Sequence, residues 1–248
     1  MKDYIIGIDC ATDPRKRGIA IATYNGNVCH MESADTGMGD DELVSVTSRC
    51  LGPDNRVLLA LDAPLGWPST MGMVLMQHQA GQGLGRDAND LFRRWTDKFI
   101  KKEYGLQSLD VGADHIARTA HSALQLLETL RRRYGHPIPL AMDRNFPGMA
   151  AIEVYPAAAL KVCDLPFRNY KKRNETKTRQ SILNGILKEA IIIPDNVHQT
   201  LIESADALDA VVCILSGMDF LIGKARPPQN PLEQEAALKE GWIWLRAK

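Results

Sequence analysis

The chain has 248 residues, of which 45% are hydrophobic and 24% are charged, and its 30 lysines and arginines balance 30 aspartates and glutamates. This composition excludes a largely disordered chain, which would have fewer apolar side chains or a large net charge. A formal net charge of zero also excludes the overall attraction typical of non-specific nucleic-acid binders, so a nucleic-acid partner would need a local basic patch.

The cysteines and the apolar segments indicate the cellular compartment. The five cysteines are scattered and never form a CxxC pair, which predicts neither a disulfide framework nor a zinc knuckle and favours a reducing compartment. The longest apolar segment, 205–222, contains three aspartates that a membrane-spanning helix would not tolerate at low cost. We therefore expect a cytoplasmic protein without a membrane anchor.

The first part of the sequence predicts a β-meander followed by a helix and a fourth strand. Strand-like runs occupy residues 4–10, 18–24 and 27–34, and Asn25-Gly26 is a strong hairpin signal between the last two. A helical pattern from Asp40 ends at Gly52-Pro53, and the apolar run 56–61 is typical of a strand covered on both faces.

The rest of the chain predicts further helices and one more strand. Residues 66–112 are rich in glycine and show little periodicity before 93–104, so we interpret them as an insertion in a single domain, 1–248. The patterns predict helices at 113–134, 157–162, 178–189 and 204–223 and a strand at 150–155. The sequence thus predicts an α/β fold with a mixed five-stranded sheet, the fourth strand beside and parallel to the first, and helices on both faces.

Acidic residues in the predicted buried strands are the most informative feature. Asp9 closes the first strand, Asp62 closes the fourth, and Glu153 lies inside the fifth. A carboxylate in a buried strand costs several kcal/mol unless a cation or several hydrogen-bond donors compensate it. Three such residues on one sheet suggest a shared cation.

The last helix contributes two more candidates, Asp206 and Asp209. Positions 206, 210, 213 and 217 form one helical row of small residues that can pack against the sheet. Asp206 would then face the strand ends, and Asp209 could reach the same cation or support its ligands.

Each acid also has an ordinary structural interpretation. Asp9 and Asp62 could be turn residues, and Asp206 could be a first-turn acid behind Ser204 as the N-cap of the helix. We favour the shared cation because independent turn and cap residues have no reason to fall together on the first strand, the fourth strand and the last helix.

The ligand types define the expected chemistry. Carboxylates without histidine or cysteine favour a hard cation, Mg²⁺ or Mn²⁺. Such ions, held by bridging acids, can activate water and stabilise the leaving oxygen when a phosphodiester is hydrolysed. We therefore assign Asp9, Asp62 and Asp206 as metal ligands, add Glu153 and Asp209 to the catalytic set, and expect phosphodiester cleavage.

Five segments together resemble one known family. They are residues 6–11 (IGIDCA), 60–66 (ALDAPLG), 93–97 (RRWTD), 153–158 (EVYPAA) and 206–210 (DALDA). From about residue 4 to Trp242 the chain resembles the domain of unknown function 429 family, regarded as predicted nucleases of the RNase H-like fold. The resemblance implies a five-stranded RNase H-like sheet with Asp9, Asp62 and an acid of the last helix around the metal ions.

The last helix is also similar to that of Holliday-junction resolvases. In those enzymes an acid precedes an Asp-Ala-Leu sequence by three residues, and here Glu203 and Asp206 would match. Asp209 is an additional acid, so the resemblance leaves open which helix acid is the ligand.

Two basic groups are candidates for substrate binding. Lys171, Lys172 and Arg173, together with Lys177 and Arg179 and beside Phe167 and Tyr170, could hold phosphates and stack on bases, or could be a solvated basic loop and helix start. Arg93 and Arg94 could clamp a phosphate, or could pair with Asp97 at helical spacing.

Three functions follow from these observations. The first is a metal-dependent nuclease acting on DNA or RNA, as a monomer or a homodimer. The second is a small-molecule kinase or ATPase of the actin-like superfamily, which would need the same core twice, with a second Asp-x-Gly-Thr-type turn that the sequence lacks. The third is a non-catalytic RNase H-like scaffold that binds nucleic acid or protein.

Overall fold

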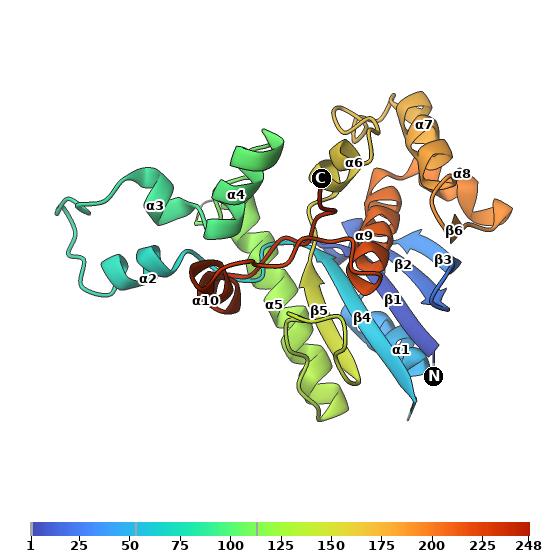
Figure 1. Ribbon diagram of the computed structural model, residues 1–248, viewed down its shortest axis with the longest axis horizontal. Coiled ribbons are helices and arrows are strands. Elements are labelled where there is room, and N and C mark those ends of the chain that lie inside the picture. The colour runs from blue at the N-terminus through green and yellow to red at the C-terminus, as the bar shows by residue number, and fades with distance from the viewer. Residues whose placement is uncertain (1, 53, 113) are drawn as a thin grey trace.

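The computed structural model describes residues 2–52, 54–112 and 114–248. Its centre is a mixed sheet with the strand order β5-β4-β1-β2-β3-β6 (Figure 1). The strands are β1 (Lys2–Asp9), β2 (Gly18–Tyr24), β3 (Cys29–Thr36), β4 (Asn55–Asp62), β5 (Met149–Glu153) and β6 (Ile191–Ile192).

The strand directions agree with the predicted topology. β1, β2 and β3 form an antiparallel meander, whereas β4 is parallel to β1 and β5 is parallel to β4. The prediction of five strands is wrong, because the sheet has six. β6 contributes Ile191 and Ile192 in parallel pairing with Cys29 and His30 at the edge of β3, and two residues are too few to show the alternation by which a strand is recognised.

Helices cover both faces of the sheet. They are α1 (Asp40–Cys50), α2 (Ser69–Leu75), α3 (Ala88–Phe92), α4 (Trp95–Tyr104), α5 (Asp114–Tyr134), α6 (Pro156–Val162), α7 (Thr176–Ile186), α8 (Asp195–Glu203), α9 (Ala205–Leu221) and α10 (Pro231–Glu240), with a short 3-10 helix at Pro14–Lys16. The predicted helix end at Pro53 and helix start at Ala113 lie outside the described residues. The sequence patterns missed α2 and α3, which are short, and α8. They also missed α10, which exposes Leu232 and Leu238 and so has no single buried stripe.

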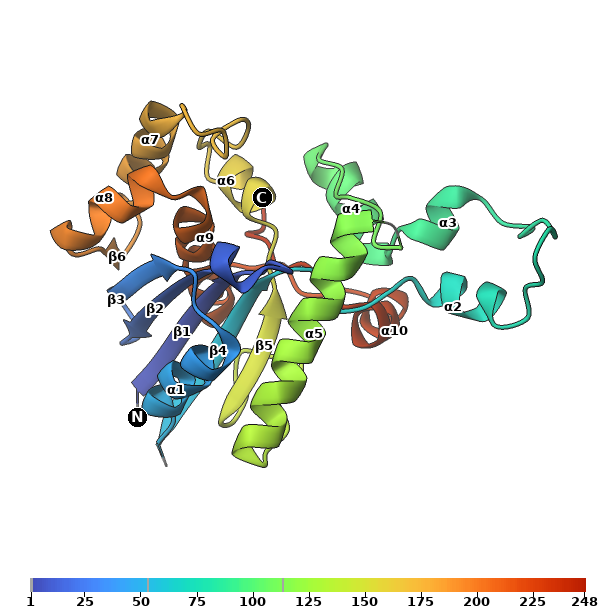
Figure 2. The ribbon, with the colours of Figure 1, turned by 180° about the vertical axis from the view of Figure 1, so that it is seen from behind.

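The two faces of the sheet pack against different helices because successive side chains of a strand point to opposite sides. Ile6 and Ile8 of β1 pack with Leu43 of α1 and Leu127 of α5. Ile5 lies on the opposite face, in the core that includes α9 and its neighbours α6, α7 and α8. Figure 2 shows α1 and α5 in front of the sheet, with α9 behind it.

Helix α9 lies so close to the sheet that glycines are required where they meet. A Cβ on Gly7 would lie 2.0 Å from the carbonyl oxygen of Ala210, and a Cβ on Gly18 would lie 2.0 Å from that of Asp206. From the helix side, a Cβ on Gly217 would lie 2.7 Å from Ile5 Cγ2. The row of small residues therefore packs on the sheet, as the sequence predicts.

Helices α2, α3 and α4 belong to the segment interpreted as an insertion, and α2 and α3 extend away from the sheet (Figure 1). The Glu240 carboxylate, at the end of α10, accepts hydrogen bonds from the backbone N–H and hydroxyl of Ser69 at 2.8 and 2.7 Å, and from the Trp95 N–H at 2.8 Å. One side chain thus ties both α2 and α4 to α10. Among the described helices, none is long and apolar enough to cross a membrane.

The contact between α9 and the sheet can be tested with an added methyl group. We expect Gly7→Ala to lower the free energy of unfolding by at least about 1–3 kcal/mol, because the new Cβ overlaps the Ala210 carbonyl. The matched control is Gly72→Ala in α2, whose Cβ would meet nothing within 4 Å and which should be neutral or stabilise by up to about 1 kcal/mol. Urea denaturation measures the free energy of unfolding of both variants. Equal changes in the two variants would contradict the close contact between α9 and β1.

Candidate metal centre

Two strand-end aspartates lie side by side because their strands are parallel and in register. Asp9 of β1 is the register partner of Asp62 of β4. Asp209 of α9 is the third acid, and the three carboxylates each offer an oxygen within 4.8 Å of the others. We call Asp9, Asp62 and Asp209 the acid cluster.

Asp206, expected as the third ligand, is not among the three acids of the cluster, whereas Asp209 is. The Ser204 hydroxyl caps α9 by accepting a hydrogen bond from the Ala207 N–H at 3.1 Å, so Asp206 is a first-turn acid. Its backbone contacts Gly18 of β2, whereas Ala210 contacts Gly7 of β1. Position 206 therefore lies over β2, and Asp209, which is fully buried, lies nearer the ends of β1 and β4.

Burial and mutual repulsion raise the pKa values of the acid cluster. Burial, followed by the charges of Asp62 and Asp209, raises the pKa of Asp9 to about 9. Burial raises the pKa of Asp62 to about 7, with Lys171 opposing the shift and Asp209 adding to it. The pKa of Asp209 is also raised, chiefly by burial. At neutral pH the cluster thus retains protons, which a divalent cation would displace.

The oxygen atoms of Asp209 show why a cation fits the cluster. The Tyr170 hydroxyl donates a hydrogen bond to Asp209 Oδ1 at 2.7 Å. Asp209 Oδ2 is buried and is paired with the Lys171 ammonium at 2.5 Å, and no other described residue donates a hydrogen bond to it. Three adjoining carboxylates with a single ammonium beside them form an oxygen-only ligand set of the kind that Mg²⁺ or Mn²⁺ prefers.

The acid cluster adjoins a cavity of about 320 Å³. Asp9, Asp62, Tyr155 and Lys171 are among the residues that line it. A volume of about 300 Å³ is at the lower end of the range for small-ligand sites. A small ligand in the cavity can therefore reach two of the three carboxylates, those of Asp9 and Asp62.

Glu153 lines the same cavity but is not in the acid cluster. Its two carboxylate oxygens accept hydrogen bonds from Arg94 at 2.6 and 2.7 Å. Arg94 also donates to Asp97 from Nε and Nη2, each at 3.0 Å. Arg94 is only 1% exposed and is the counter-ion of two buried acids. Arg93 is likewise paired, with Asp110 at 2.9 Å.

The basic segment reaches the site through one residue. Lys171 extends to Asp209, whereas Lys172 and Arg173 are exposed. Tyr170, expected to stack on a base, is instead buried and binds Asp209. Sequence reasoning missed the role of Arg179, which is also buried.

Arg179 fixes the backbone of the basic segment. Its guanidinium donates to the carbonyls of Tyr170 at 2.6 Å, Lys172 at 2.9 Å and Ile202 at 2.6 Å. Its position in a run of basic residues, at the start of an amphipathic helix, gave no sign that it points inward. The segment is therefore held against the end of α8, next to the acid cluster.

Comparison with known families gives a match over nearly the whole sequence. The family model that matches residues 7–233 is described as "Protein of unknown function (DUF429)". No curated protein and no solved structure matches the sequence.

The raised pKa values predict a pH-dependent stability. An unfolded aspartate is ionised above about pH 4, whereas folded Asp9 has a pKa of about 9. Because the folded state then binds more protons, its stability is greatest below pH 4 as far as this group is concerned, and is lost as the pH rises towards 9. In EDTA, we expect wild-type protein to lose about 1–3 kcal/mol between pH 6 and 9, and Asp9→Asn to lose less. Urea denaturation at both pH values measures this.

The control for this experiment is Glu235→Gln, which removes an exposed acid of α10. It should keep the wild-type pH dependence. Wild-type stability that does not change between pH 6 and 9 would show that the cluster ionises without cost.

The Arg94 ion pairs predict a stability effect rather than a binding effect. We expect Arg94→Met to cost about 3–5 kcal/mol, because it leaves the Glu153 and Asp97 carboxylates buried without a cation. Arg93→Met removes a pair with the half-exposed Asp110 and should cost less than about 1 kcal/mol. Thermal and urea denaturation measure both variants, and a stable Arg94→Met protein would contradict the structural role.

Proposed function

We propose that this chain, which belongs to the DUF429 family, is a divalent-metal-dependent nuclease of RNase H-like fold. It would hydrolyse phosphodiester bonds of DNA or RNA. The observation that carries the proposal is the acid cluster, in which β1, β4 and α9 each supply one carboxylate beside a cavity. Independent turn and cap residues would not converge in this way.

The topology supports the RNase H-like part of the proposal. Without the edge strand β6, the order is β5-β4-β1-β2-β3, with an antiparallel meander and two parallel additions. The family resemblance implies this sheet, with acids on the first strand, the fourth strand and the long helix expected at 204–223. Asp9, Asp62 and Asp209 lie in β1, β4 and α9, which are those three elements.

The residues of the acid cluster would hold Mg²⁺ or Mn²⁺. Such a cation, when bound, activates water and stabilises negative charge on the phosphodiester oxygens. Tyr170 orients Asp209 through its hydroxyl, and Arg94 pairs with Glu153. Lys172 and Arg173, which follow Lys171 in the sequence, are exposed and can hold phosphates of a nucleic-acid backbone.

The kinase or ATPase alternative gains no support from the fold. That function needs two copies of the core, and the described strands form one sheet of six. No observation favours the non-catalytic scaffold, because its distinguishing feature would be the loss of strand-end acids, and Asp9 and Asp62 are present.

Substitution of single acids tests the proposal. We expect Asp9→Asn, Asp62→Asn and Asp209→Asn each to reduce Mg²⁺-dependent cleavage by about 100-fold or more while substrate affinity stays close to wild type, because ligand loss affects chemistry more than binding. Asp206→Asn is the matched control, since it removes an acid of the same helix from outside the cluster, and it should retain cleavage within about 10-fold.

The assay uses single-stranded, duplex, hybrid and branched DNA and RNA with Mg²⁺ or Mn²⁺, beside an ATP hydrolysis assay. Neutralising Lys172 and Arg173 should weaken binding and flatten its salt dependence. Cleavage that survives Asp9→Asn would expose a contaminating nuclease, and ATP turnover without cleavage would favour the actin-like alternative.

A further inference from the structure

The Lys171 ammonium pairs with one acid of the cluster, Asp209. Its Nζ lies 2.5 Å from Asp209 Oδ2, and no other described residue donates a hydrogen bond to that oxygen. The Lys171 side chain is 54% exposed and also lines the cavity. The charged end is therefore at the buried acids, while much of the side chain remains in contact with solvent.

We propose that Lys171 is a displaceable internal cation: it competes with the divalent metal for the acid cluster, and metal binding releases its ammonium into the cavity to hold a substrate phosphate. This inference rests on the proposed function, because it assumes a metal at the acid cluster. It gives Lys171 a role that metal binding by the three carboxylates does not by itself require.

Electrostatics makes the two cations compete for Asp209. A carboxylate-bound Mg²⁺ lies about 2.1 Å from its oxygen ligand, and the ammonium already lies 2.5 Å from Asp209 Oδ2. An ammonium and a divalent ion held on the same buried carboxylate would repel each other strongly, because the dielectric screening is weak there. The lysine supplies one positive charge for three carboxylates, so a divalent ion compensates the cluster better.

The surrounding contacts let the side chain move while the backbone stays in place. Arg179 holds the carbonyls on either side of Lys171, those of Tyr170 and Lys172. Tyr170 is further held by Asp209. The lysine has a flexible four-carbon stem and can turn its ammonium from Asp209 to the cavity by rotation of that stem alone.

The exchange couples metal binding to substrate binding. In the metal-free protein the ammonium is paired with Asp209, so that its charge is already engaged by a carboxylate. Once the metal has replaced it, a free cation faces the cavity beside the metal. Metal and phosphate should therefore bind with positive cooperativity, by about 5-fold or more.

Amine reactivity measures the exchange directly in the wild-type protein. Reductive methylation followed by peptide mass spectrometry compares Lys171 with and without saturating Mg²⁺, with Lys172 as an exposed internal control. We expect metal to increase the labelling of Lys171 about 5-fold or more and to leave Lys172 unchanged. In Asp209→Asn, Lys171 should be reactive even in EDTA, because its charge partner is gone.

Metal affinity provides the second measurement. Mn²⁺ binding followed by electron paramagnetic resonance should be about 10-fold tighter in Lys171→Met than in wild type, and unchanged in Lys172→Met. Lys171→Met keeps an unbranched stem, and circular dichroism checks that it is folded.

The outcomes separate this inference from the proposed function. Mn²⁺ that binds wild type without changing Lys171 labelling overturns the exchange and leaves the metal centre intact. Equal or weaker Mn²⁺ binding in Lys171→Met likewise overturns the competition. Failure of Mn²⁺ to bind either protein overturns the metal centre itself, and the competition with it.

Discussion

The close contact of α9 with the sheet determines where the acids of this protein meet. The helix backbone touches β1 at Gly7 and β2 at Gly18, with carbonyl oxygens where a Cβ would otherwise be. This contact carries Asp209 into a position beside Asp9 and Asp62, which the parallel pairing of β1 and β4 has already brought together. A larger side chain at either glycine would hold the helix, and with it the third carboxylate, away from the strand ends.

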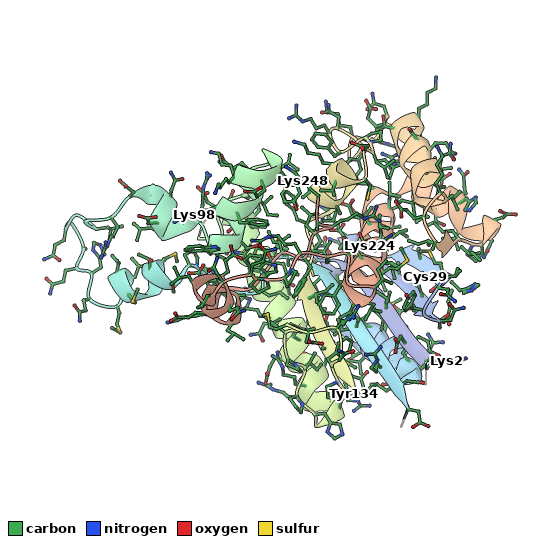
Figure 3. All side chains as sticks on the ribbon, viewed as in Figure 1. Lys2, Cys29, Lys98, Tyr134, Lys224 and Lys248 are labelled. Carbon is green, nitrogen blue, oxygen red and sulfur yellow. The ribbon has the colours of Figure 1, made fainter. Side chains whose placement is uncertain are left out.

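A second constraint is the pairing of buried charges at the cavity wall; Figure 3 draws the side chains on the ribbon. Arg94 pairs with both Glu153 and Asp97 and so compensates part of their charge. The acid cluster has three carboxyl groups and one lysine, and it retains protons at neutral pH because the pKa values are raised. The two groups of acids are therefore stabilised differently, one by a buried arginine and the other by protons and a half-exposed lysine.

Much of this arrangement could be predicted from the sequence, and the remainder has identifiable physical reasons. Hairpin chemistry, apolar runs and the parallel crossover predicted that β1 and β4 would be neighbours, and the register confirms that Asp9 and Asp62 meet. The choice between Asp206 and Asp209 depended on which strand each turn of α9 contacts, and spacing along a helix does not contain that information. The sequence likewise did not predict that Arg94 and Tyr170 point inward, because their partners Glu153 and Asp209 are distant in sequence.

Helix α10 and the segment after it affect the order in which the chain can fold during synthesis. The Glu240 carboxylate holds Ser69 and Trp95, the Ile243 N–H donates to Thr96 Oγ1, and the Trp244 N–H donates to the Glu153 carbonyl. A ribosome makes these residues more than thirty positions after Asp209. The three acids are therefore synthesised before the residues that hold α2 and α4. The order of translation allows the carboxylate site to form before the hydrogen bonds that fix these helices beside it.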